Sequence, residues 1–103
     1  MVGRSKGTPI VLAPMNDALG LVITEGIENA LSAHTATGLG AWAAGAASRL
    51  PGLANAIPRY TDTVTILADP DPYGQHHATE LARRLEARRG FAEVNLVDLR
   101  ALR

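Results

Sequence analysis

Residues 63–74 read TVTILADPDPYG, a β-branched apolar segment that runs into two carboxylates, two prolines and a glycine. The apolar part, 63–69, predicts a strand buried on both faces, as strands of parallel sheets are. Asp69 and Asp71 each precede a proline, which disfavours helical backbone and favours extended geometry. Side chains alternate along an extended chain, so the two carboxylates are expected to point the same way. Gly74 is expected to let the chain turn sharply into a helix.

The segments around this stretch alternate between strand and helix patterns. That alternation predicts an α/β fold with a mostly parallel central sheet of about four strands, flanked by helices. The expected elements are a possible edge strand at 9–14, a buried strand at 19–26, a helix at 27–38, a weak strand at 39–45, a short helix interrupted near Pro51 at 46–57, a helix at 75–89 and a last strand at 93–99.

Both longer helices are expected to bury an apolar stripe. In the first, the stripe consists of Ile27, Ala30, Leu31 and His34. In the second, it consists of Ala78, Leu81, Ala82 and Leu85.

Length and composition predict a single domain. The chain has 103 residues, ten basic and ten acidic side chains, and no cysteine, which excludes disulfides, thiolate zinc sites and a cysteine nucleophile. No apolar run is long enough for a signal peptide or a membrane span, so a cytoplasmic protein that does not contact membrane is expected. Residues 1–18 are interpreted as a lead-in with a possible edge strand, 19–100 as the domain and 101–103 as a tail.

Two of the expected strands end in acidic residues. Glu25 closes one, and Asp69 with Asp71 closes another. Ligands of open parallel sheets bind beyond the carboxyl ends of the strands, so the three carboxylates converge if these strands are neighbours. Like charges that close repel unless a cation or a proton intervenes, and Mg²⁺ or Mn²⁺ suits oxygen ligands. Each acid taken alone equally fits a turn or a helix cap.

Two other motifs use the same letters. An EF-hand loop would place ligands at Asp69, Asp71, Gly74 and Glu80, but a strand precedes the stretch and prolines occupy loop positions. A haloacid-dehalogenase-type phosphatase uses Asp-x-Asp with the first Asp as nucleophile, and it needs a later lysine. The only lysine is Lys6, upstream of the motif. Both motifs therefore fit less well than a metal site.

With Glu25-Gly26 and Asp69-x-Asp71-x-x-Gly74 in place, the sequence resembles a toprim domain. It is most similar to those in DNA primases and primase-helicases of phages, plasmids and other mobile elements. The segments ITEGIENALSAHTATG, AWAAG and VTILADPDPYGQHHATELARRL carry the resemblance over about residues 19–100. The resemblance implies a compact, Rossmann-like fold. It also implies Glu25 as general acid or base of nucleotidyl transfer, and Mg²⁺ bound by Asp69, Asp71 and Glu25, with both glycines shaping the site.

One position departs from the family pattern. Asn29 stands where many primase toprim domains carry an acid, and an amide can hydrogen-bond Glu25 or a metal-bound water but adds no charge. The sequence also contains no Cys/His zinc module and no helicase phosphate loop. The chain is therefore interpreted as one module of a larger replication protein or a small stand-alone relative, incomplete as an isolated domain. The implied partners are a single-stranded DNA template, ribonucleotides, and zinc-binding and helicase domains in the same or a partner chain.

Some further residues are weaker candidates. Arg83, Arg84 and Arg88 are candidates for phosphate contacts, although an exposed helix face explains them equally well. His76 and His77 could reach a metal or a phosphate, but solvated surface is the favoured interpretation.

The leading functional hypothesis is Mg²⁺-dependent nucleotidyl transfer in RNA primer synthesis on single-stranded DNA. One alternative is phosphodiester cleavage, as in toprim nucleases and topoisomerases, although neither Tyr60 nor Tyr73 lies in a recognised nucleophile motif. Another alternative is a non-catalytic DNA-binding or assembly module.

Overall fold

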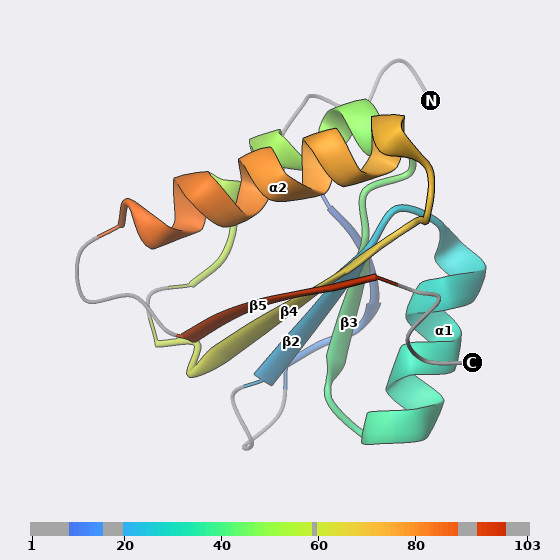
Figure 1. Cartoon of the computed structure of the whole chain (residues 1–103). Coiled ribbons are helices and arrows are strands. Elements are labelled where there is room, and N and C mark those ends of the chain that lie inside the picture. Colours follow the sequence, from blue (N-terminus) through green and yellow to red (C-terminus); the bar gives the residue numbers. More distant parts are fainter. Residues whose placement is uncertain (1–8, 16–19, 59, 89–92, 99–103) are drawn as a thin grey trace, which may run out of the picture.

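A computed structural model describes residues 9–15, 20–58, 60–88 and 93–98 of the chain (Figure 1). The predicted lead-in at 1–8 and tail at 101–103 lie outside these residues. No helix in the described part is long and apolar enough to cross a membrane. The elements are β1 (Ile10–Ala13), β2 (Gly20–Thr24), α1 (Ile27–Thr37), β3 (Gly40–Ala43), the 3₁₀ helices η1 (Ala47–Arg49) and η2 (Pro51–Asn55), β4 (Thr63–Ala68), α2 (Pro72–Glu86) and β5 (Glu93–Asp98).

The strands form one sheet in the order β1-β3-β2-β4-β5. Strands β2 to β5 are parallel to one another, and β1 runs antiparallel at the edge beside β3. The predicted α/β fold with a mostly parallel sheet is therefore confirmed. The sheet has five strands because the segment at 9–14, treated as a possible edge strand, does pair.

The helices lie on opposite faces of the sheet. Figure 1 shows α1 on one face and α2, with the short segments η1 and η2, on the other. The chain thus leaves β2 toward one face and leaves the neighbouring strand β4 toward the other. In open α/β sheets this reversal opens a crevice at the carboxyl ends of the two strands. The fold therefore has the edge at which ligands of such sheets bind where β2 and β4 end.

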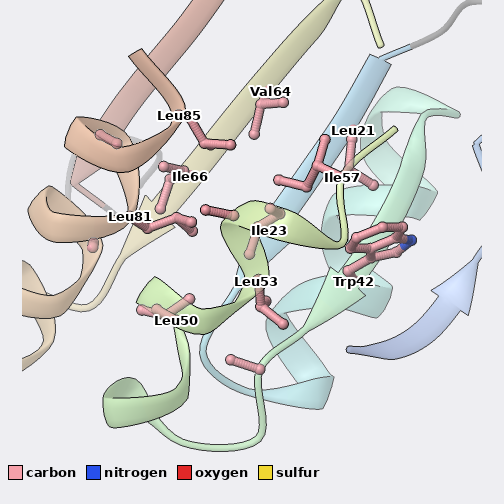
Figure 2. Close-up of a cluster of buried hydrophobic side chains, with 14 of the residues drawn as sticks. Leu21, Ile23, Trp42, Leu50, Leu53, Ile57, Val64, Ile66, Leu81 and Leu85 are labelled. Atoms are coloured by element: carbon pink, nitrogen blue, oxygen red, sulfur yellow. The ribbon is translucent and has the colours of Figure 1, made fainter. Parts of the chain in front are cut away.

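The main core fills the space between the sheet and α2 (Figure 2). Alternate residues of β2 and β4 point into it, and the predicted stripe of α2 is buried there. Trp42 is also in this cluster and only 8% exposed. The largest fully buried side chains of this core include Leu21, Ile23, Leu50, Leu53, Ile57, Val64, Ile66, Leu81 and Leu85.

The predicted buried face of α1 is partly wrong. Ala30 and Ala33 are buried, but Ile27 and Leu31 are 46% and 47% exposed, and His34 is exposed too. Ala30 packs in a cluster with Ala41 and Ala43 of β3. Small residues on both elements let the helix approach the sheet closely, so the larger side chains lie at the flank of the contact.

Two helix boundaries also differ from the sequence prediction. The segment 46–57 contains two 3₁₀ helices and no α-helix, with Pro51 at the first turn of η2. Proline is tolerated at the first position of a helix, because the N–H that it lacks would have no acceptor within the helix. Helix α2 also begins with a proline, at Pro72 instead of the predicted Gln75. Its C-cap is Ala87, and the predicted stop at Gly90 lies outside the described residues.

Candidate functional site

Glu25 follows the last residue of β2 and is held through its backbone. The amide of Gly45, in the loop after β3, donates to the Glu25 carbonyl at 2.9 Å, and Ala44 N–H donates to the Thr24 carbonyl at 2.9 Å. The buried Thr24 hydroxyl donates to the Gly26 carbonyl at 2.7 Å. These bonds fix the turn that directs the Glu25 side chain beyond the sheet edge.

Asp71 caps the N-terminus of α2. Its backbone is extended, with φ −95° and ψ 154°, as the following proline favours. Its Oδ1 accepts a hydrogen bond from the Gly74 amide at 2.7 Å, and its carbonyl accepts from the Gln75 amide at 3.0 Å. The helix-cap interpretation left open for this acid is therefore realised, and the cap explains why α2 starts so early.

Gly74 has a different role from the predicted one. It lies in the first turn of α2, so the chain enters the helix at Asp71 and Pro72, before Gly74. A Cβ built on Gly74 would lie 3.3 Å from Asp69 Cβ, 3.4 Å from Glu25 Oε1 and 3.5 Å from Asp71 Oδ1. The glycine thus leaves room for three acidic side chains that gather around one point.

The gathered acids change the protonation of Glu25. Burial raises the pKa of Glu25 above its ordinary value, and a hydrogen bond shared with Asp69 raises it further. The negative charges of Asp69 and Asp71 act in the same direction. The predicted convergence of Glu25 with the Asp pair is therefore present, and the fold holds Glu25 in a state that favours a proton or a cation.

These carboxylates offer the hard oxygen donors that Mg²⁺ prefers. In the described ranges, no three His, Cys, Asp or Glu side chains are already placed as a group that could hold a metal ion. Mg²⁺ usually binds through one or two carboxylates and completes its shell with waters and phosphates. Glu25 and Asp69, the pair in contact, fit that mode, whereas Asp71 uses Oδ1 for the helix cap. The three-carboxylate metal site stays a prediction.

The other predicted shaping residues lie at the start of α1. Gly26 is the N-cap in an extended conformation with φ −107°, and a Cβ there would meet nothing within 4 Å. Asn29 lines a hollow of about 510 Å³ between α1 and the sheet, together with Val22 and Leu67. The structure therefore places Asn29 beside the apolar face of α1, and its proposed bond to Glu25 stays a prediction.

Sequence reasoning missed Gln75 and Asp98. Asp98 closes β5 at the same sheet edge as Asp69, and its Oδ2 accepts a hydrogen bond from Gln75 Nε2 at 2.8 Å. The two side chains line a hollow of about 270 Å³ with Ala68, which directly precedes Asp69. The signal was an acid at the end of an apolar strand, the same signal that identified Glu25.

Arg83 and Arg84 lie in the last turn of α2 and Arg88 lies just beyond its C-cap, all away from the carboxylates. Arg83 is about 18 Å along the helix from Asp71, at 1.5 Å per residue. Arg83 and Arg84 bind Glu80, and their hydrogen bonds lower its pKa to about 2. Arg88 donates to two carbonyls at the end of η2. Their predicted contacts with nucleic acid stay predictions.

Comparison with known families agrees with this geometry. A family model described as a Toprim domain matches residues 20–100, most of the chain. No curated protein and no solved structure shows significant similarity to the chain. Toprim domains are metal-binding, nucleic-acid-related modules of primases, topoisomerases and nucleases, and they generally bind Mg²⁺. With its parallel sheet and its acids at the ends of β2 and β4, the chain belongs to the toprim family.

Proposed function

We propose that this chain is the catalytic toprim module of a cytoplasmic DNA primase or primase-helicase. It joins ribonucleotides into an RNA primer on single-stranded DNA in a reaction that depends on Mg²⁺. The observation that carries the proposal is the contact between Glu25 and Asp69 at the edge where β2 and β4 end. Resemblance to primase toprim domains of mobile elements favours this activity over the others known in the family.

Glu25 acts as general base in this reaction. The 3′-hydroxyl of one ribonucleotide gives its proton to the Glu25 carboxylate and attacks the α-phosphorus of a ribonucleoside triphosphate. A new P–O bond forms, and the bond to pyrophosphate breaks. The raised pKa of Glu25 suits proton transfer, because a general base works best when its pKa lies near the operating pH.

Asp69 supports this step in two ways. Its negative charge and hydrogen bond raise the proton affinity of Glu25, and with Glu25 it would hold Mg²⁺. When bound, the ion stabilises negative charge on the transferred phosphoryl group. Asp71 keeps the first turn of α2 in place beside both acids. Zinc-binding and helicase domains in the same or a partner chain would complete template recognition and movement.

The test is incorporation of labelled ribonucleotides on a 5′-labelled single-stranded DNA template by the native protein with Mg²⁺. Glu25→Gln should lower incorporation by about 10²- to 10⁴-fold, the usual contribution of a general acid or base. Asp69→Asn should lower incorporation and remove its stimulation by added Mg²⁺. Asp62→Asn is the matched control, because Asp62 is an exposed acid that precedes β4 at its other end.

Three outcomes would overturn the proposal. Equal incorporation by wild type and Glu25→Gln would remove Glu25 from the chemistry. Shortening of the template without incorporation would assign phosphodiester cleavage instead. Template binding with neither reaction would assign a DNA-binding or assembly module.

A further inference from the structure

Three aromatic rings lie together on the first two turns of α2. Tyr73 is 62% exposed, although tyrosine usually buries most of its ring. His77 lies one turn further, and its ring packs edge to face against Tyr73 with centroids 4.7 Å apart and an interplanar angle of 74°. His76 packs against His77 in the same way at 5.2 Å and 71°. These three residues are called the aromatic patch.

The patch is adjacent to the carboxylates. Tyr73 follows Asp71 by two residues, in the same helical turn as Gly74, where an added Cβ would lie within 3.5 Å of an atom of each of the three acids. The edge-to-face contact with His77 restrains the Tyr73 ring while more than half of its surface stays open. A restrained ring with an open face has little entropy to lose when a flat ligand stacks on it.

The side of α2 that carries the patch also carries the Glu80–Arg84 ion pair and borders η1 and η2. Arg84 follows His77 by seven residues, about two turns, and so lies on the same side of the helix; it pairs with Glu80 and donates to the Pro51 carbonyl of η2 at 3.3 Å. This side of the helix therefore lies toward η1 and η2, as Figure 1 shows for the segments as a whole. The last residue of η1 is the half-buried Arg49. A strand that crosses the patch would find a cation on the bordering segment for its phosphates.

We propose that Tyr73 and His77 form a stacking platform for an unpaired base of the nucleic-acid strand whose backbone reaches Glu25 and Asp69. The proposal rests on the proposed function, because it assigns a contact for the template or primer of that reaction. Every base has a flat face, so stacking holds a strand without reading its sequence. Bases in a duplex are already stacked on their neighbours, so the platform selects single strands.

The test measures binding of a fluorescein-labelled single-stranded DNA by anisotropy, with Mg²⁺ present. Tyr73→Ala should weaken binding roughly 5- to 140-fold, the range that stacking of one base gives. Tyr73→Phe keeps the ring and should stay within about twofold of wild type. Tyr60→Ala is the matched control: Tyr60 is 64% exposed and precedes β4, whose six residues span about 20 Å and end at the carboxylates.

A strand of abasic sites separates stacking from phosphate contact. Tyr73→Ala should bind the abasic strand as wild type does, because no base is present to stack. Equal affinity of wild type and Tyr73→Ala for the normal strand overturns the platform. A wild-type Kd above about 100 μM, the weak end of non-specific binding, also overturns the platform and would leave the patch as a contact for another protein.

The platform and the proposed function can fail separately in these experiments. Asp69→Asn removes a carboxylate without touching the rings, so its effect on primer synthesis reports on the chemistry. If Asp69→Asn leaves primer synthesis unchanged while Tyr73→Ala weakens binding, the proposed function fails and the platform stands. If Asp69→Asn lowers primer synthesis while Tyr73→Ala leaves binding unchanged, only the platform is overturned.

Discussion

Glu25 and Asp69 follow adjacent parallel strands, and their side chains meet at Gly74, where the interaction between the two carboxyl groups raises the pKa of Glu25. The register that brings them together pairs Thr24, the last residue of β2, with Leu67, so β4 runs one residue further than β2 at this edge of the sheet. A slip of one residue would turn one of the strands over and send its acid to the opposite side. The contact therefore depends on the buried apolar residues that fix the register.

Replacing Glu25 by glutamine should stabilise the fold at neutral pH. The pKa of Glu25 is raised in the folded protein, so the folded state binds more protons than the unfolded state at pH values above 4.5. The free energy of unfolding of the wild type should fall as pH rises through the folded pKa. Urea unfolding should show Glu25→Gln more stable than wild type at pH 7, with the difference lost below pH 4.5.

Exposed Glu86 provides the control for that measurement, because Glu86→Gln changes the same chemistry at the far end of α2. Addition of Mg²⁺ should raise the wild-type unfolding free energy at pH 7 and leave Glu25→Gln less affected. Equal stability of wild type and Glu25→Gln at pH 7 would contradict the electrostatic account.

Two variants of Asp71 should separate the effect of the helix cap on stability from the effect of the negative charge. Asp71→Ala removes the acceptor of the Gly74 amide and should lower the free energy of unfolding by about 1 kcal/mol. Asp71→Asn removes the charge but keeps a good N-cap oxygen, so its stability should stay within a few tenths of a kcal/mol of wild type. Thermal unfolding of the two variants checks this. An equal loss in both would show that the charge, and not the cap, stabilises α2.

Gly74→Ala should weaken metal binding more than it changes stability. The new Cβ would press on Asp69 Cβ and Glu25 Oε1. The helix preference of alanine, about 1 kcal/mol over glycine, offsets that crowding in the unfolding free energy. Displaced ligands typically lower metal affinity about 10- to 100-fold. Broadening of amide signals by Mn²⁺ measures this loss.

Gly26→Ala is the matched control for that variant. Its Cβ would enter open space, so Mn²⁺ broadening around Glu25 should match wild type. If both variants lose the ion equally, the space at Gly74 is not what the site requires.

Replacing Arg88, just beyond the end of α2, should affect stability more than replacing Arg83 in its last turn. Arg88 donates to the carbonyls of Ala54 and Ile57 at 2.6 and 2.9 Å, so Arg88→Ala should lower the unfolding free energy by about 1 to 3 kcal/mol. Arg83 pairs with Glu80 on the surface, and Arg83→Ala should cost less than about 1 kcal/mol. Urea unfolding compares them. Arg83→Ala then tests phosphate contact cleanly, since such a contact would reduce the salt dependence of DNA binding.

The sheet and α2 were predictable because their sequence signals are strong. The run TILA in β4 is apolar and β-branched, and the stripe through Leu81 and Leu85 has a clear helical period. The convergence of Glu25 with Asp69 followed from one topological rule, that parallel strands end at the same edge. The family resemblance then supplied the expected chemistry.

Other features depend on packing that periodicity does not encode. In α1, Ala30 shares a face with either Ile27 or Ala33; Ala30 packs on the alanines of β3, whereas Ala33 packs on Val22 and Leu67 and Ile27 stays half exposed. Gly74 leaves space for two side chains from other segments, and this depends on how those segments pack in the tertiary structure. Asp98 was missed although its signal was present, because one acid after a weakly buried strand resembles ordinary surface.

The strand order also sets which parts of the fold open first. β1 and β5 form the edges of the sheet, whereas β2 and β4 each have a paired strand on both sides. Amide hydrogens of β2 and β4 should therefore exchange with solvent last, and those of β1 and β5 earlier. Transient fraying at either edge leaves the strands that carry Glu25 and Asp69 paired with each other, so the acid pair persists through the opening events that the fold undergoes most often.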